Sequence, residues 1–216
     1  MKKLLGIFVS AVLLVSISAC SSESVQNSQQ PENSPQNATT ELTESDDALK
    51  EWDGIWNNFH SYFENPGLDE AYQTLADREG ITALEVKSRY MDGKTYQCDI
   101  AALGIDGQAV TFYSKTQDAE ASTEDILATM NYTYKGEETD DFDRTWSHFE
   151  ADGDSPYPHL FLLPAEADGP GNTMMHFHFR YGSTVEELKG AEGWYATMIR
   201  CGSDIDLVIG HMTFED

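Results

Sequence analysis

The stretch YQCDIAALGIDGQAVTFY, residues 96–113, contains the signal that decides the fold class. Apolar and polar residues alternate on both sides of Asp106-Gly107, and this dipeptide favours a tight turn between two antiparallel strands. The sequence therefore predicts a hairpin with strands over 96–105 and 108–113.

Further segments with a period of two residues follow the hairpin. They predict strands over 128–134, 144–150, 159–163 and 174–181. An acidic loop is expected over 136–143 and a Gly/Pro-rich loop over 164–172. Towards the end, 183–188 reads as a short helix capped by Ser183 and 204–212 as a final helix, while 194–200 fits either a loop or a strand.

Before Gly93 the apolar period is 3.6 residues, which is typical of helices. The first predicted helix starts near Asp47, ends at 65–67 and places five aromatic or aliphatic side chains on one face. These are Trp52, Ile55, Trp56, Phe59 and Phe63. Helices are also expected over 68–78 and 82–91. Thr82 and Glu85 have the spacing of a capping box in the latter. Helices followed by antiparallel strands indicate an α+β fold whose strands curl into a small barrel or sandwich.

The first residues predict export from the cytoplasm. Two lysines precede an apolar run over 4–17, which is too short for an ordinary membrane span. The segment that ends in Cys20 resembles the lipobox of bacterial lipoproteins, which implies removal of residues 1–19 and a diacylglycerol on the Cys20 sulfur. A plain secretory signal with a chance cysteine is the alternative. Residues 20–41 are rich in Ser, Gln and Asn and read as a disordered tether before a domain over 42–216.

The net charge of −25, or −27 without residues 1–19 and their two lysines, excludes nucleic acid and anionic lipid surfaces as favoured partners. Membrane attachment is expected through the lipid anchor only. Without Cys20, two cysteines remain, Cys98 and Cys201. In an oxidising compartment they could form a disulfide or stay as two buried thiols.

The segment Met175-His176-Phe177-His178-Phe179-Arg180 has the most informative chemistry. Neighbouring residues of a strand point to opposite faces, so His176 and His178 share one face, and two imidazoles about 6.6 Å apart at their Cα atoms can meet at one ion. Two histidines hydrogen-bonded on a polar sheet face are the alternative. His159 opens another predicted strand, and antiparallel pairing would bring it to the same neighbourhood.

Three neutral imidazoles suit zinc, and also cadmium, nickel, cobalt or copper, better than calcium or magnesium. With three protein ligands a fourth position stays open, and such a site can exchange metal with a partner or activate water. Of the other histidines, His148 could lie near the metal and His211 could supply the fourth ligand, or each could have no metal role. Asp53 could orient a ligating histidine or be a simple helix-start charge.

The chain resembles the ZinT/YodA family of bacterial extracytoplasmic zinc-binding proteins, which also occur as the C-terminal domain of some zinc-uptake lipoproteins. The likeness extends from about Leu42 to the C-terminus. It rests on residues 49–56 (Leu-Lys-Glu-Trp-Asp-Gly-Ile-Trp), residues 99–107, the His176-Phe177-His178-Phe179 strand with Gly182 after it, and Trp194.

This resemblance implies a calycin or lipocalin-like antiparallel β-barrel with flanking helices, and a metal at one barrel end held by His159, His176 and His178. It also implies zinc buffering or recruitment for an ABC importer through that importer's solute-binding component. The chain departs from the family in two respects. A His-rich N-terminal segment found in some members is replaced by the tether, and Met130 and Ala151 fall near the positions of the family's cysteine pair.

The expected function is therefore that of an extracytoplasmic, lipid-anchored, monomeric protein that binds zinc and is not an enzyme. Two alternatives remain open at this point. A zinc hydrolase or hydratase would use the open coordination position, and a calycin barrel without a metal role would bind an apolar ligand.

Overall fold

The computed structural model of the chain describes residues 48–169 and 171–213. The predicted signal peptide over 1–19, the lipidation site Cys20 and the tether over 20–41 lie outside the described residues. Within the described ranges, no helix is both long enough and apolar enough to cross a bilayer.

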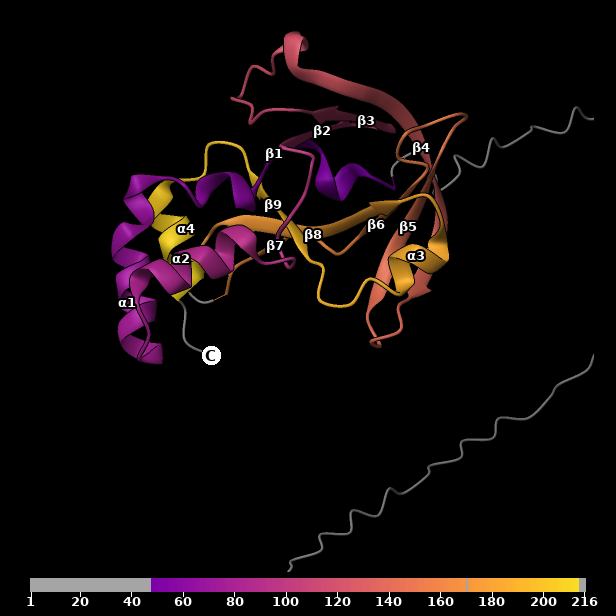
Figure 1. Cartoon of the computed structure of the whole chain (residues 1–216). Helices are drawn as coiled ribbons and strands as arrows, with labels where there is room; N and C mark the ends of the chain where they lie inside the picture. Colours follow the sequence, from indigo (N-terminus) through magenta and orange to yellow (C-terminus); the bar gives the residue numbers. More distant parts are fainter. Residues whose placement is uncertain (1–47, 170, 214–216) are drawn as a thin grey trace, which may run out of the picture. The chain divides into compact units, whose positions relative to one another are not determined.

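A closed ring of antiparallel strands forms the larger part of the described chain (Figure 1). In the order of the ring these are β6 (His159–Leu162), β5 (Thr145–Ala151), β4 (Ile126–Thr139), β3 (Ala109–Tyr113), β2 (Ala102–Asp106), β1 (Gly54–Asn58), β9 (Ala196–Arg200) and β8 (Met175–Gly182). Pairing of β6 with β8 closes the ring, and the short β7 (Glu166–Ala167) adds to β8 outside it. The predicted α+β barrel with flanking helices is thus confirmed.

The hairpin that decides the fold forms as predicted. Asp106 pairs with Ala109 across the turn, and Gly107 has a φ of 58°, a left-handed conformation that glycine adopts without steric cost. β2 begins at Ala102, so it is shorter than the alternation from Tyr96 suggests.

The helices that follow β1 also agree with the sequence. They are α1 (Asp69–Glu79) and α2 (Ala83–Asp92), and both bonds of the capping box between Thr82 and Glu85 are present. Later come α3 (Val185–Lys189), which Thr184 caps in place of the expected Ser183, and α4 (Ile205–Thr213). Short 3-10 turns complete the helical content: η1 (Lys50–Trp52), η2 (Phe59–Tyr62), η3 (Pro66–Leu68) and η4 (Thr123–Asp125).

The predicted first helix is wrong, because its residues supply β1 and two 3-10 turns. Gly54 has a φ of 117°, which breaks the helical path two residues after Trp52. From there Trp56 lies in β1, which is hydrogen-bonded to β2 on one side and β9 on the other. Trp52 and Trp56 are buried as expected, but in the barrel interior rather than on a helix face.

The expected acidic loop over 136–143 is also largely wrong. β4 continues to Thr139 and pairs with β5 along most of its length, with a bulge between Tyr134 and Gly136. Gly136 has a φ of 110° at this bulge, so the strand bends there and continues. The acidic residues Glu137 and Glu138 are therefore part of β4.

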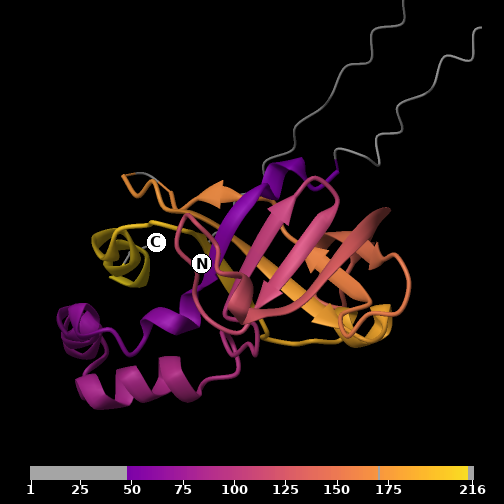
Figure 2. The same cartoon turned by 90° about the horizontal axis from the view of Figure 1, so that it is seen from above.

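Two apolar cores lie on opposite sides of the strands that bear the histidines. The barrel interior is filled by side chains such as Trp56, Phe149 and Phe177, as expected for an eight-stranded barrel. A second core joins the outer face of β9 to the helices through Ile199, Phe59 and members of α1, α2 and α4. Figure 2 shows these three helices gathered at one side of the barrel.

A buried ion pair lies on the outer face near α3. Asp140 accepts hydrogen bonds from the backbone N–H groups of Phe142 and Arg144, from Trp146 Nε1 and from Arg180 at 3.1 Å. Arg180 is fully buried. Burial alone would raise the pKa of Asp140, but these donors and the arginine charge outweigh it and hold the pKa below its usual range.

We expect Asp140→Asn to lower the free energy of unfolding by about 3–5 kcal/mol, because an amide N–H₂ would face donors and leave the Arg180 charge buried without a partner. Urea unfolding at neutral pH measures this. Asp69→Asn is the control, since the Asp69 side chain is 72% exposed and 4.0 Å from Lys87, and it should change stability by no more than about 0.5 kcal/mol. Equal effects of the two substitutions would contradict the assignment.

Candidate metal centre

Strand β8 presents two histidines to the space between the barrel and the helices. Phe177 and Phe179 point into the barrel interior, so the alternation of the strand turns His176 and His178 outwards. Helix α4 packs against this face and brings His211 beside them. The three histidines thus come from two elements that are far apart in the sequence.

The spacing of the rings suits a shared ion. The ring centroids of His176 and His178 are 5.5 Å apart, and those of His176 and His211 are 5.4 Å apart. Two imidazoles on one tetrahedral zinc ion, with Zn–N distances of about 2.0 Å, have centroids about 5 Å apart.

Thr197 fixes the tautomer of His178. These residues face each other on β9 and β8, and His178 Nδ1 lies 2.9 Å from Thr197 Oγ1. The hydroxyl donates its hydrogen to the backbone oxygen of Tyr195, so it must accept the hydrogen bond from His178 Nδ1–H. The lone pair of neutral His178 is therefore on Nε2, the atom left for a metal.

Asp168 does the same for His211. Its Oδ1 lies 2.5 Å from His211 Nδ1, and a carboxylate can only accept here, so the neutral form of His211 has its lone pair on Nε2. Phe59 supports the other side of the ring in an edge-to-face contact at 5.1 Å. A carboxylate behind an imidazole is the usual way in which proteins orient a metal-ligating histidine.

His176 is the central ring and has an unpaired nitrogen. Its side chain is buried at 6% exposure, and its Nδ1 has no hydrogen-bond partner. A buried polar nitrogen without a partner is costly, and a metal ion would satisfy it. The pKa of His176 is lowered, first by burial and then by His211, so the ring is neutral and able to coordinate near pH 7.

His178 is more strongly perturbed. Burial is the largest cause, followed by the neighbouring His176 and His211, and together with the weaker influence of Arg144 and Arg180 they lower its pKa to about 3. His176 and His178 are therefore both neutral near pH 7, and each ring has a lone pair available for a metal.

The described residues contain no three His, Cys, Asp or Glu side chains that already converge as a complete coordination set. His176 is close to both partners, while His178 and His211 are turned towards Thr197 and Asp168. Completing the set requires the three rings to converge further, by rotation about their Cα–Cβ and Cβ–Cγ bonds.

An opening of about 350 Å³ leads to His178 from the surface. Thr95, Tyr96, Arg144, Leu163 and Tyr195 complete its lining. Arg144 stacks over the Tyr195 ring at 4.2 Å, so the entrance has a positive group in an otherwise acidic protein. The opening gives small ligands a route to the histidines.

The structure corrects the expected meeting of His159 with the other two histidines. β6 does pair with β8, but in a register that places His159 opposite Gly182 and Leu162 opposite Phe179. His159 is therefore about 13 Å along β8 from His178, at 3.3 Å per residue. Its ring contacts His148 instead.

Three other residues have structural contacts. Asp53 accepts a hydrogen bond from Gly107 N and thus holds the β2–β3 turn rather than a histidine. Cys98 and Cys201 are both free thiols. Cys98 contacts Ile100 and Tyr181, whereas Cys201 contacts Gln117. The possible disulfide between them is not formed.

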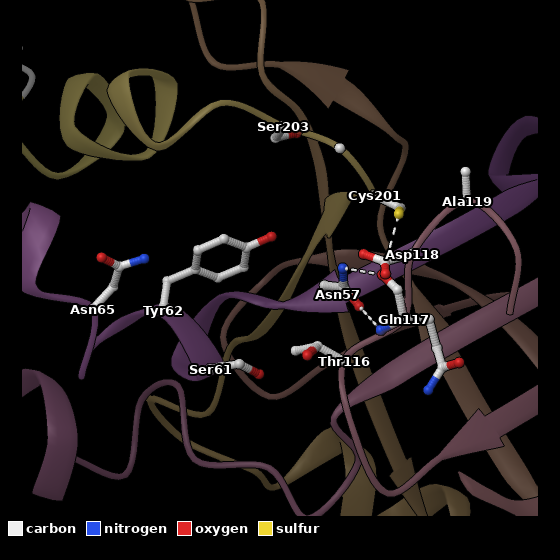
Figure 3. Close-up of a pocket in the computed structure, with 11 residues that line it drawn as sticks. Asn57, Ser61, Tyr62, Asn65, Thr116, Gln117, Asp118, Ala119, Cys201 and Ser203 are labelled. Carbon is white, nitrogen blue, oxygen red and sulfur yellow. Dashed lines mark hydrogen bonds between the residues drawn. The ribbon is translucent and has the colours of Figure 1, made fainter. Parts of the chain in front are cut away.

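Figure 3 shows a second hollow, of about 400 Å³, near Cys201. Its polar groups bond mainly to one another. Asn57 and Gln117 exchange two hydrogen bonds, and the Cys201 thiol points to the Gln117 carbonyl oxygen at 3.2 Å. These groups tie β1 to the segment after β3, which is a structural role, and no histidine lines the hollow.

Residues 36–207, more than half of the chain, match the family described as ZinT (YodA) periplasmic lipocalin-like zinc-recruitment. The chain belongs to this family. The resemblance in the Trp-Asp-Gly-x-Trp and His-Phe-His motifs is thereby confirmed, as is the calycin-like fold.

Individual relatives agree with this membership. The chain is 28% identical over 156 residues to the probable metal-binding protein YrpE of Bacillus subtilis (strain 168), and the match covers 66% of this chain and 55% of that protein, so the chain spans about half of its length. The Zn(II)-bound ZinT-like domain of Streptococcus pneumoniae AdcA is similar in structure, with a TM-score of 0.54 and 21% identity over 77% of this chain and 89% of that one.

The whole Zn(II)-bound AdcA gives the same TM-score of 0.54 at 20% identity, and there the match covers 77% of this chain and 35% of AdcA. At identities of 20–21% the two structures show the fold that this chain shares with them.

We expect the acid sensitivity of the chelator-treated protein to decrease in His178→Gln. Because the folded pKa of about 3 lies below the value of about 6.5 in an unfolded chain, unfolding takes up a proton between these limits. The free energy of unfolding therefore falls as the pH drops, by up to about 1.4 kcal/mol per unit for this residue. Urea titrations between about pH 7.5 and 5 measure the slope.

His60→Gln is the matched control, since His60 bonds to Met91 O away from the three histidines. In His60→Gln the free energy of unfolding should fall with pH as steeply as in the native protein. If it also falls as steeply in His178→Gln, the buried, neutral state of His178 is excluded.

Proposed function

We propose that this ZinT-family protein binds zinc outside the cytoplasm through His176, His178 and His211. The single observation that supports this best is the buried His176 ring, which has an unpaired Nδ1 and another imidazole on each side within 5.5 Å. The ligand set keeps His176 and His178 from the sequence prediction and replaces His159 by His211.

The arrangement suits capture and release of the ion. The three ligands are imidazoles, which favour zinc and other late transition metals over calcium or magnesium. Two of them are oriented by Thr197 and Asp168, and an ion held by three protein ligands has only three protein–metal bonds to break on leaving. The opening at His178 gives a fourth ligand, water or a group from a partner, access to the ion.

We further propose that the protein is a binding protein rather than an enzyme, and that it buffers or recruits zinc for an ABC importer through the importer's solute-binding component. Family membership and the similarity to AdcA support this role. Attachment through a lipid on Cys20 and a monomeric state are part of the same proposal. The barrel interior is filled by aromatic side chains, so we place no apolar ligand there.

We expect His176→Ala to abolish tight zinc binding, because it removes the central ligand. Equilibrium dialysis of the native protein and the variant, near pH 7.5 and near pH 5, measures this. Binding by the native protein should weaken at the lower pH as protons compete for the imidazoles. His60→Ala should bind like the native protein, and unchanged binding by His176→Ala would rule out the site.

His211→Ala separates this ligand set from the one predicted from sequence. It should weaken zinc binding strongly, while His159→Ala should leave the tight site intact, because His159 lies about 13 Å away along the sheet. Competition with a chromophoric chelator reports both affinities. The reverse result would restore His159 as the third ligand.

Asp168→Asn should weaken zinc binding about 10–100-fold, because an amide can no longer hold His211 in one tautomer as a carboxylate does. Asp206→Asn is the control, since Asp206 is exposed on α4, the helix that contains His211. The two affinities are compared in the same chelator competition, and equal affinities would remove Asp168 from the site.

A further inference from the structure

A second pair of histidines lies on the outer face of the barrel, on β5 and β6. His148 Nε2 and His159 Nδ1 are 3.2 Å apart, and the ring centroids are 5.3 Å apart with an angle of 43° between the planes. The register pairs Glu150 with His159 and His148 with Phe161, so the two histidines are diagonal neighbours on adjacent strands.

This distance suits a shared metal ion as well as a hydrogen bond. Two nitrogen ligands of a tetrahedral ion with metal–nitrogen distances of about 2.0 Å lie about 3.3 Å apart. One proton now lies between His148 Nε2 and His159 Nδ1, and without it each nitrogen has a lone pair directed towards the other. A metal ion that replaces this proton would require only a small movement of each ring.

Two carboxylates lie near the pair. Glu150 is directly opposite His159, and such cross-strand neighbours have Cβ atoms about 5 Å apart. Its present partner is Lys135 at 3.4 Å, a half-exposed ion pair that contributes little to stability and leaves the carboxylate able to turn. On the other side of His159, the Glu187 carboxylate covers Gly182, the residue that pairs with His159 on β8.

The electrostatics agree with this geometry. Burial, the neighbouring His159 and, more weakly, Lys135 lower the pKa of His148, whereas Glu138 and Glu150 act in the opposite direction. His148 is 6% exposed, so its ring is held in place by packing against Phe161. His148 is therefore a fixed, neutral donor with two carboxylates near it.

We propose that His148 and His159 form a second, separate site for a divalent transition metal of the class that prefers imidazole, such as Zn²⁺ or Ni²⁺, with Glu150 as its third ligand. The site shares no residue with the first. About 13 Å along β8 separates Gly182, beside His159, from His178, so one ion cannot join the two groups. With two imidazoles instead of three, the second site binds more weakly than the first.

Zinc titration of the full chain by isothermal calorimetry tests this. The native protein should bind two equivalents, one tight and one weaker. The double variant His148→Gln/His159→Gln should lose the weaker equivalent and keep the tight one, and His176→Ala/His178→Ala should do the opposite. Glutamine keeps most of the buried volume at His148, and His60→Gln is the control for the loss of one half-buried imidazole.

A double variant at His148 and His159 that still binds two equivalents would overturn the second site, as would a His176→Ala/His178→Ala variant that binds none. Loss of the tight equivalent only on substitution of His148 and His159 would overturn the first site and leave this one standing. In the native protein and in His176→Ala/His178→Ala, Glu150→Gln should weaken binding of the second equivalent, and unchanged affinity would remove Glu150 from that site.

Discussion

The packing of α4 against the outer face of β8 and β9 is the constraint on which the metal centre depends. Ile199 and Phe59 join the barrel to the helices in a buried apolar core, and that core places His211 against His176. The barrel interior is a separate core on the other side of the same strands. β8 has Phe177 on one face and His176 on the other. The same strand therefore contributes an apolar side chain to the barrel interior and a histidine to the proposed metal site.

The polar groups at this boundary are satisfied by a small number of long-range hydrogen bonds. The Thr197 hydroxyl accepts a hydrogen bond from His178 and donates one to the backbone oxygen of Tyr195. Arg180, two residues further along β8, donates a hydrogen bond to Asp140. His178 and His211 therefore each have Nδ1 in a defined hydrogen bond before any ion arrives, which reduces the reorganisation that binding requires. Among the described residues, Arg180 Nη2 and His176 Nδ1 are buried without a partner, and His176 Nδ1 belongs to the ring that lies between the other two imidazoles.

Local sequence patterns correctly predicted the parts of the fold that depend on neighbouring residues. The Asp106-Gly107 turn, the capping box at Thr82 and the alternation around His176 all formed as predicted. The first helix was wrong because residues 52–63 are apolar at helical spacing, while Gly54 and pairing with distant strands determine their conformation. His159 was misplaced because the offset between β6 and β8 is a property of the closed barrel. No local signal predicted that His211 and Asp168 would meet, although a histidine on an amphipathic helix after the last strand was visible.

The position of His211 has a consequence for how the site comes into being. Every barrel strand precedes α4 in the chain, so the two histidines of β8 can reach their places while the third is still absent. A chain shortened ahead of residue 205 would retain all the strands and yet offer an incoming ion two imidazoles in place of three. In the proposed site, three-histidine coordination therefore requires that the chain has been made through α4 and that this helix has docked, which couples metal capture to the completion of folding.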